Sequence, residues 1–379
     1  MGKKCIRELG GILEKVHDNS DAFGPFPVSV LWLISNNCNL NCKHCSVFGT
    51  PLVRKSELDT ETVLLILHKL YKSLKIRDLQ LLGGEPLLRS DIKIIIEWAN
   101  QNDINISIVT NVKIIDYDFL KFIKDNNLSN ITFRIDGITE GSYGRVRCPG
   151  IFHKVVENLN KTIKFKHPET KILVNYVLTK VNMFQPTEII KFFDTIGVDL
   201  LYLDILEITG NALKNKDQLF VQPMSYFKFF DDLYQNYPSC KMEIIPEITP
   251  IIVDYFNRKY KLKNPIPYVG CPALTSQFWL LADGLYTPCD PFYRNENLKK
   301  ILNENTYSLL EKDIEDILAD DSIKKLILMK KNLNYNRYYP CNRCKYLGNF
   351  CQPCIIPALL NQDYNNSLCS IAMNRIKGI

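Results

Sequence analysis

Ten of the 13 cysteines in this 379-residue chain fall into two sets, and these sets constrain its fold and chemistry more than any other feature. The first set is Cys38, Cys42 and Cys45, in the spacing CxxxCxxC. The second lies in the last third of the chain and consists of Cys271, Cys289, Cys341, Cys344, Cys351, Cys354 and Cys369. In a reducing compartment, closely spaced thiols are more often metal ligands or redox groups than structural disulfides. The sequence therefore predicts metal–sulfur chemistry.

The composition excludes several other classes of protein. With 46% hydrophobic and 23% charged residues, the chain can bury a sizeable core and is not mainly disordered. Its net charge of +6 is spread along the sequence, without the basic block typical of nucleic-acid-binding tails. The longest apolar runs are too short to span a bilayer, and the N-terminus lacks the apolar stretch of a secretory signal. We therefore expect a cytoplasmic protein that binds neither nucleic acid nor membrane.

Short β-rich runs alternate with helical stretches over the first half of the chain. The predicted strands are 28–35, 79–82, 105–110, 131–135, 172–178 and 200–203, and the predicted helices are 63–74, 91–100, 116–124, 152–166 and 186–196. This alternation predicts an α/β fold with a parallel sheet, either doubly wound or curved into an incomplete barrel. In such sheets reactive groups lie in the loops that follow the strands.

The regular alternation stops near residue 210. Residues 213–260 favour one or two helices rich in Phe and Tyr, and 261–267 read as a linker. From 268 to 379 the periodicity is weak, and such a segment usually needs metal or disulfide links to hold a fold.

The first cysteine set directly follows the first predicted strand. Three soft thiolate ligands within eight residues suit an iron–sulfur cluster or zinc. A four-iron cluster held by three cysteines keeps one iron open for a substrate or cofactor. Zinc with His44 as the fourth ligand is the alternative. It is disfavoured because His44 lies between two of the cysteines and would have to reach the metal beside its own neighbour.

This loop resembles the signature of radical S-adenosylmethionine (SAM) enzymes, and the resemblance covers residues 28 to 210. It implies a partial (β/α)6 TIM-like barrel in which Cys38, Cys42 and Cys45 hold a [4Fe-4S] cluster. In that family the open iron chelates SAM, and the reduced cluster cleaves it to a 5'-deoxyadenosyl radical that abstracts a hydrogen atom from the substrate. His44 occupies the position where the family places a ring or apolar residue against the adenine.

A second family feature is Gly83-Gly84-Glu85-Pro86, after the second predicted strand. Glycines let the backbone approach a ligand closely, and the Glu85 carboxylate can accept hydrogen bonds from an ammonium group. Read alone, these residues indicate a turn. By resemblance, Gly83, Gly84 and Glu85 bind the methionine amino group of SAM.

Weaker matches follow the third and fourth strands. Asn111 could hydrogen-bond the nucleoside or its own loop, and Val112 replaces the Gly of the family's Thr-Asn-Gly. Arg134 replaces a small hydroxyl residue near the methionine carboxylate, which it could pair with if it points into the barrel. If it points outward, it is only a surface charge, because strand alternation decides its direction. Arg147 is the competing carboxylate ligand, since it resembles an Arg that precedes a helix start in the family.

The second cysteine set resembles the SPASM extension of radical SAM enzymes, although two CxxC pairs alone would indicate a zinc ribbon. By resemblance, Cys271, Cys289 and Cys354 hold auxiliary cluster I, and Cys341, Cys344, Cys351 and Cys369 hold auxiliary cluster II. With the radical SAM cluster, this gives three [4Fe-4S] clusters. Cys351 is displaced by one residue from the family spacing.

Cluster I then has three assigned cysteines. Residues 264–269 contain no cysteine, so either one iron is open or a distant residue such as Cys240 completes the site. Cys5, Cys148 and Cys240 otherwise indicate ordinary buried thiols. The predicted segments are an N-terminal extension (1–27), the barrel core (28–212), a helical bridge (213–267) and the SPASM domain (268–379).

Enzymes with this combination mostly modify peptides, so our leading hypothesis is a maturase of a ribosomally made precursor peptide. It would draw electrons from a flavodoxin or ferredoxin. Only 37 residues precede Cys38, too few for the winged domain that binds leader peptides in many such enzymes. A separate protein or the barrel surface would then recognise the leader. Aromatic residues at 226, 227, 229, 230 and 234 are one candidate surface, but their helical spacing favours helix core.

Three alternatives to the peptide maturase stay open at this point. One is an anaerobic sulfatase maturase, although Leu82 stands where those enzymes tend to carry Gln. The others are an enzyme of haem or cofactor biosynthesis and a zinc-stabilised binding protein. For a catalytic acid or base the sequence offers Asp204, after the sixth strand, with Tyr202 on the same strand face. A surface Asp is the commoner outcome for such a residue.

Overall fold

A computed structural model describes residues 29–47, 57–237, 239–261, 271–302, 307–332, 338–347, 351, 353–360 and 367–375. The predicted N-terminal extension and most of the predicted linker lie outside the described residues. No helix in the described ranges has the length and apolar character needed to cross a lipid bilayer.

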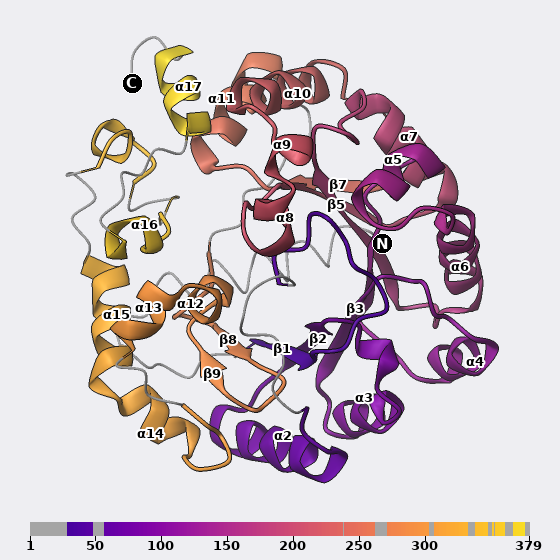
Figure 1. The fold of residues 1–379 in the computed structure, drawn as a ribbon, viewed down its shortest axis with the longest axis vertical. Helices are drawn as coiled ribbons and strands as arrows, with labels where there is room; N and C mark the ends of the chain where they lie inside the picture. The colour runs from indigo at the N-terminus through magenta and orange to yellow at the C-terminus, as the bar shows by residue number, and fades with distance from the viewer. Residues whose placement is uncertain are drawn as a thin grey trace.

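A curved sheet of nine strands forms the centre of the protein, with helices around its outer side (Figure 1). The strand order is β7-β6-β5-β4-β3-β2-β1-β8-β9, and every pair is parallel except β8 with β9. The first six strands are β1 (Ser29–Ser35), β2 (Asp78–Gly83), β3 (Asn105–Thr110), β4 (Asn130–Arg134), β5 (Lys171–Leu178) and β6 (Leu200–Ile205). The predicted α/β fold with an open, partial barrel is confirmed.

The connecting helices begin and end where local chemistry favours it. Asp59 accepts a hydrogen bond from the backbone N of Thr62 at 2.8 Å and caps the first helix, while Gly197 ends α7 with a φ of 93°. The helices of this half are α2 (Thr60–Leu74), α3 (Ile92–Gln101), α4 (Tyr117–Asp125), α5 (Glu140–Val146), α6 (Phe152–Phe165) and α7 (Pro186–Ile196). Alternate residues of the strands, such as Trp32 and Phe133, are completely buried in the core.

The segment after β6 holds more than the helices predicted for it. It contains α8 (Gly210–Lys214), α9 (Lys216–Leu219), α10 (Pro223–Gln235), β7 (Glu243–Pro246) and α11 (Pro250–Tyr260). β7 is a seventh parallel strand that extends the sheet beyond β6. The aromatic side chains of α10 are buried, which confirms that they are helix core and excludes them as a surface for leader recognition.

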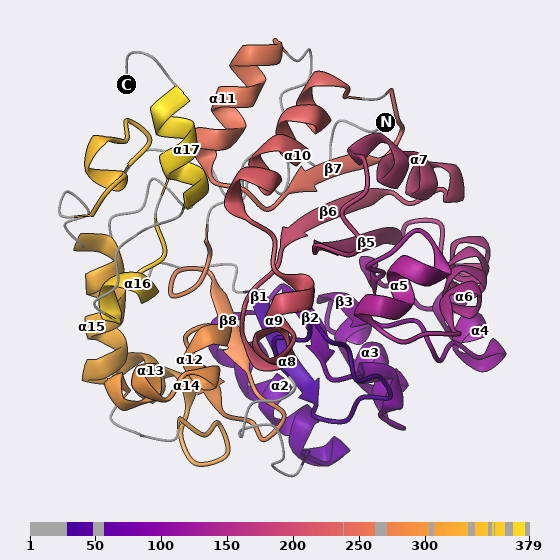
Figure 2. The same cartoon turned by 45° about the horizontal axis from the view of Figure 1, so that its top comes forward.

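The cysteine-rich segment continues the same sheet from its other edge. Ser29 of β1 pairs with Gln277 of β8, and β9 pairs with β8. The elements of this segment are β8 (Gln277–Leu280), β9 (Tyr286–Thr287), α12 (Asp290–Arg294), α13 (Glu296–Ile301), α14 (Ile314–Ala319), α15 (Asp321–Asn332), α16 (Ile356–Leu359) and α17 (Ser367–Arg375). Figure 2 shows α17 beside α11, and α12 contacts β9.

Candidate active site

The first cysteine loop follows β1 and is held in place by two later helices. The backbone N of Lys43 donates to the carbonyl of Val146 at 2.9 Å, and the backbone N of Asn211 donates to the carbonyl of Cys45 at 2.9 Å. The amide of Asn211 also reaches the carbonyl of Cys42. The ends of α5 and the start of α8 therefore fix the path of the loop.

The other thiols of this loop lie close enough to Cys38 and Cys42 to affect their protonation. Burial raises the pKa of Cys42 to about 12; Arg147 opposes the rise, and Cys45 and Cys38 add to it. Burial likewise raises the pKa of Cys38, with further contributions from Glu85 and Cys45. Three thiols that repel one another when ionised need a cationic partner in order to act as ligands.

Gly83 and Gly84 bring β2 against the backbone that leads into the cysteine loop. The backbone N of Gly84 donates to the carbonyl of Ser35 at 2.7 Å, and the backbone N of Glu85 donates to the carbonyl of Asn37 at 2.7 Å. A Cβ atom at Gly84 would lie 2.2 Å from the carbonyl oxygen of Asn37, and Gly83 has a φ of 135°. The close approach that requires these glycines is thus made by protein backbone.

The Glu85 carboxylate is buried and ties this turn to the end of β3. It accepts hydrogen bonds from the hydroxyl of Thr110 at 2.8 Å, the backbone N of Asn111 at 2.7 Å and the backbone N of Leu87 at 3.1 Å. Burial raises the pKa of Glu85, against these hydrogen bonds. A carboxylate offers about four acceptor positions, so this one can accept one further hydrogen bond from a ligand.

Asn111 lies directly against the cysteine loop. Its Nδ2 donates to Oδ1 of Asn39 at 2.8 Å and lies 3.7 Å from Sγ of Cys38. The next residue, Val112, is buried and has a φ of 66°, a conformation that glycine adopts more readily than a β-branched residue. The amide of Asn158 donates to the carbonyl of Val112 at 2.7 Å and holds this turn.

Asp136 links the cysteine loop to Arg147 and was given no role from the sequence. It is completely buried, and its Oδ2 lies 3.0 Å from Nε2 of His44 and in contact with Nε of Arg147. The positive charge of Arg147, with His44, holds the pKa of Asp136 below its usual range despite burial. Nη1 of Arg147 lies 3.7 Å from Sγ of Cys42, so its positive charge lies directly beside one thiol of the loop.

A second polar group lies on the inner face of the sheet. Arg134 of β4 is in register with Asn175 of β5, whose amide donates to Asp204 of β6 at 2.7 Å. Burial raises the pKa of Asp204, and the charge of Arg134 opposes this rise. Arg134 therefore points toward the other strands of the inner face and not outward.

Glu247 joins this group from the end of β7. Its carboxylate accepts a hydrogen bond from the backbone N of Ile205 at 3.3 Å. Although its side chain reaches solvent, enclosure by the surrounding protein and the charge of Asp204 raise the pKa of Glu247 to about 8. The sequence gave no reason to single out Glu247, because the strand that positions it was not predicted.

The structure brings the second cysteine set together in two groups. Burial raises the pKa of Cys289 to about 12, with added repulsion from Cys354 and Cys271. The pKa of Cys369 is likewise raised by burial and by repulsion from Cys341 and Cys344. Cys271, Cys289 and Cys354 are thus neighbours, as are Cys341, Cys344 and Cys369, and their assignment to clusters I and II stays a prediction.

The other two cysteines considered for these clusters are placed as follows. The backbone N of Cys351 donates to the carbonyl of Tyr346, two residues after Cys344, at 2.8 Å. Cys240 donates its thiol to the carbonyl of Met242 at 3.2 Å, and Asp194 is the charge that affects it. Within the described residues, the groups that act on Cys240 do not include Cys271 or Cys289.

The described residues can be tested for their fit to the predicted cofactors. Within the described residues, no three Cys, His, Asp or Glu side chains, the cysteines of either set included, already converge on the position of a single metal ion. Three buried polar atoms near the first cysteine loop and Cys45 have no hydrogen-bond partner in the described residues: Nδ2 of Asn39, Nδ1 of His44 and the hydroxyl of Tyr293. Unpaired buried polar groups are costly, so these atoms fit a polar ligand beside a cluster.

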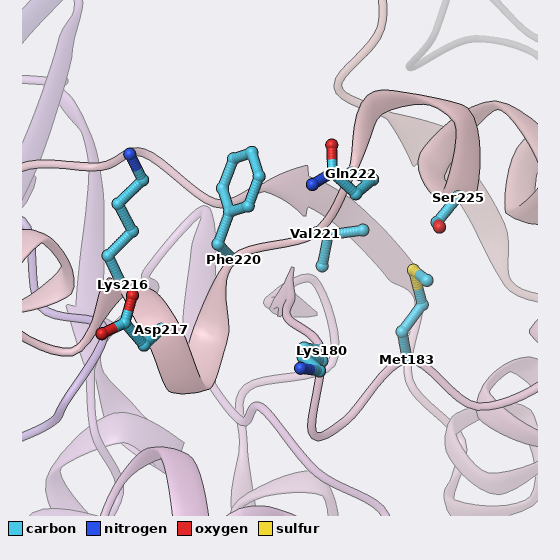
Figure 3. A pocket seen from close by; sticks show the side chains of 8 residues that line it. All are labelled: Lys180, Met183, Lys216, Asp217, Phe220, Val221, Gln222 and Ser225. Atoms are coloured by element: carbon cyan, nitrogen blue, oxygen red, sulfur yellow. The ribbon is translucent and has the colours of Figure 1, made fainter.

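A separate cavity of about 400 Å³ lies between the loop after β5 and the start of α10. It is lined by Lys180, Met183, Lys216, Asp217, Phe220, Val221, Gln222 and Ser225. Figure 3 shows Lys216 and Asp217 side by side at one end and Ser225 at the other. None of these residues belongs to the polar groups described above.

Comparisons with known proteins agree with this geometry. The sequence model of the radical SAM superfamily matches residues 32–214. Molybdenum cofactor biosynthesis protein 1 of Bos taurus is 27% identical over 60% of this chain and 35% of its own length. PqqA peptide cyclase of Bradyrhizobium diazoefficiens is 28% identical over 55% of this chain and 54% of its own length. The chain thus spans about a third to a half of these relatives.

The fold is also similar to that of a solved enzyme over nearly the whole chain. The structure of Streptococcus suis SuiB bound to precursor peptide SuiA has a TM-score of 0.65 and 16% identity, covering 89% of this chain and 73% of SuiB. SuiB has also been solved with S-adenosylmethionine bound. The likeness includes the cysteine-rich segment as well as the barrel.

Proposed function

The chain belongs to the radical SAM superfamily, and on this premise we propose that it modifies a ribosomally made precursor peptide, by forming a cross-link or altering a side chain. Membership implies SAM and a [4Fe-4S] cluster as cofactors, and bound together they supply a 5'-deoxyadenosyl radical. The observation that carries the peptide proposal is the fold similarity to a precursor-peptide enzyme over 89% of the chain. It extends through the cysteine-rich segment, which a barrel alone would not share.

The residues of the first site divide the work of holding the cofactors. We assign Cys38, Cys42 and Cys45 as cluster ligands. Arg147 compensates their charge through its contact with Cys42, while Asp136 fixes the guanidinium. We assign Arg134 to a ligand carboxylate, because it faces the inner side of the sheet and, within the described residues, makes no hydrogen bond to a thiol.

The ammonium group of SAM would meet the turn after β2. Glu85 has one acceptor position left beyond its three hydrogen bonds, and the turn is held by Gly83 and Gly84. Asn111 contacts Asn39 of the cysteine loop, and His44, within that loop, contacts Asp136; we assign both to positioning the nucleoside. Glu85, Asn111 and His44 are all buried.

Asp204 and Glu247 are our candidates for moving a proton to or from the peptide. Both carboxyl groups have raised pKa values, and a raised pKa suits an acid or base that works near neutral pH. Arg134 moderates the shift at Asp204. The pair lies on the inner face of the sheet, where a substrate would have to approach the cysteine loop.

The C-terminal cysteine groups complete the proposal. We assign Cys271, Cys289 and Cys354 to auxiliary cluster I, and Cys341, Cys344, Cys351 and Cys369 to auxiliary cluster II. A flavodoxin or ferredoxin would reduce the enzyme, and a separate leader-binding protein would deliver the peptide. The cytoplasm is the compartment we propose, since thiolate-bound clusters need reducing conditions.

A second candidate, a reaction in cofactor biosynthesis, is favoured by one observation. The bovine relative, which is 27% identical over 60% of the chain, is named for molybdenum cofactor biosynthesis. The match covers only 35% of that relative. The two candidates therefore share the radical chemistry and differ in the substrate.

The peptide proposal is tested by anaerobic incubation with SAM, a reductant and short peptides encoded next to the gene. Mass spectrometry should show loss of two hydrogen atoms for a cross-link, or another defined mass change, in one of them. The Cys42→Ala variant serves as the control that must leave the peptide unchanged. A wild-type enzyme that cleaves SAM and leaves every such peptide unmodified, but modifies a nucleotide, would favour cofactor biosynthesis instead.

A further inference from the structure

Lys330 lies on the buried face of α15, where an apolar residue would be expected. The side chains at 323, 326, 327 and 330 follow the i, i+3, i+4, i+7 pattern of a core-facing stripe. Ile323 and Leu326 are 0% and 2% exposed, and Lys330 is only 7% exposed. Lysine is almost never buried to this degree unless it is paired, so the surroundings of Lys330 must compensate its charge.

The direct partners of Lys330 are two backbone carbonyls. Its Nζ donates to the carbonyl of Cys271 at 2.9 Å and to the carbonyl of Ala273. Carbonyl groups satisfy hydrogen bonds but carry no net charge. An ammonium group has three N–H donors, so within the described residues one donor and the positive charge have no direct partner.

The groups that can balance this charge are the thiols predicted to hold auxiliary cluster I. Lys330 lies within electrostatic reach of Cys271, Cys289 and Cys354, the three cysteines assigned to auxiliary cluster I. Three cysteines are assigned to auxiliary cluster I, whereas four are assigned to auxiliary cluster II. The lysine thus stands beside the ligand group that carries one thiolate fewer, and it is anchored to the loop that begins with Cys271.

A buried cation beside an iron–sulfur cluster has a defined physical effect. It stabilises the more negative, reduced state and so raises the reduction potential, which is set in part by net charge and by hydrogen bonds to the sulfurs. The described residues place no comparable lysine among the charges that act on Cys341 and Cys369. The two auxiliary sites therefore differ in charge as well as in ligand number.

We propose that Lys330 is a positioning residue that raises the reduction potential of the cluster held by Cys271, Cys289 and Cys354, making this site the easier of the two auxiliary sites to reduce. The inference rests on the auxiliary clusters of the proposed function. It assigns the charge and the third N–H of Lys330 to the cluster, and it assigns the two carbonyl hydrogen bonds to anchoring the Cys271 loop.

The test is a redox titration followed by electron paramagnetic resonance on anaerobically purified, full-length protein. Lys330→Gln removes the charge and keeps N–H donors for the carbonyls, and Lys330→Arg keeps the charge. Lys331→Gln is the matched control, because Lys331 is the next residue on α15 and is exposed. The redox transition that disappears in the Cys289→Ala variant is the one that belongs to auxiliary cluster I.

In Lys330→Gln the midpoint potential of this transition should fall by at least about 59 mV, which corresponds to a tenfold change in the equilibrium constant of a one-electron reduction. Lys330→Arg and the Lys331 control should titrate like the wild type. An unchanged midpoint in Lys330→Gln overturns the proposal. If Lys330→Gln loses the cluster, its retention in Lys330→Arg supports the charge requirement, and its loss in both shows a packing role and overturns it.

The readout separates this inference from the proposed function. Zinc in place of iron in the wild-type protein would end the proposed function, whatever Lys330 does. Intact clusters with a midpoint that is insensitive to Lys330 would end only the present inference. Neither result requires the substrate to be known.

Discussion

The Nη1 atom of Arg147 lies 3.7 Å from the Sγ atom of Cys42, so an arginine from the end of α5 contacts a thiol of the first cysteine loop. The same guanidinium pairs with the completely buried carboxylate of Asp136. One cation thus serves both the loop and a buried anion. These two contacts hold Arg147 inside the protein, and they leave only part of its guanidinium group free to bind a ligand.

Removing this cation should destabilise the protein strongly. Arg147→Met leaves Asp136 with only His44 as a possible counter-charge, and breaking a buried pair by removing one partner costs about 3–5 kcal/mol. The free energy of unfolding, from anaerobic urea titration, measures this. Arg145→Met is the control, because Arg145 is exposed and binds backbone carbonyls only. Equal stability of the two variants would show that the Asp136 pair does not matter to the fold.

At position 112, replacement of Val112 by glycine should destabilise the protein less than replacement by alanine. Its positive φ costs an L-residue about 1–2 kcal/mol, and glycine avoids that cost. We expect Val112→Gly to be at least as stable as Val112→Ala. At Val155, which is equally buried but lies within α6, glycine should be about 1 kcal/mol worse than alanine. The thermal unfolding midpoints of the four variants test this expectation. If the alanine variant is more stable than the glycine variant at both sites, Val112 is not strained.

The sequence predicted the barrel half well because its signals are local. α7 has the predicted bounds, and β3 matches residue for residue, since each is a periodic run between turn residues. β7 was missed because four residues, Glu243–Pro246, are too few to show alternation. The pairing of β8 with β1 joins segments about 250 residues apart, and such a contact leaves no local pattern.

The candidate site was predicted in type and only partly in detail. The cysteines were found from their spacing, whereas Asp136 and Glu247 follow strands whose neighbours in space cannot be read from the chain. The two glycines at the end of β2 were expected to face a ligand, but the structure packs Gly83 on the backbone of Ser35 and Gly84 on the backbone of Asn37. Lys330 did leave a signal, as the one charged residue on an otherwise apolar helical stripe.

Glu247 should make stability depend on pH in a recognisable direction. Its folded-state pKa of about 8 lies above the usual value of 4.5, so the folded state holds the proton more tightly. Stability from this group is present below pH 4.5 and is lost as the pH rises toward 8.

The Glu247→Gln variant cannot ionise at this position and should lose that pH dependence. Relative to wild type it should gain stability between pH 5.5 and 8.5, by about 1 kcal/mol after allowance for solvent screening. Thermal midpoints at the two pH values measure the gain. Glu188→Gln, at an exposed position in the first turn of α7, is the control. A parallel pH dependence of wild type and Glu247→Gln would exclude a raised pKa at Glu247.

The central claim is that Cys38, Cys42 and Cys45 hold the cluster that cleaves SAM, and the formation of 5'-deoxyadenosine by anaerobically purified protein with dithionite tests it most directly. The wild type and Cys148→Ala, which removes an isolated thiol outside the two sets, should both form the product. Alanine at any of the three loop cysteines should reduce its formation to background. Persistent 5'-deoxyadenosine in the Cys42→Ala variant, or none in an iron-loaded wild type, would contradict the account.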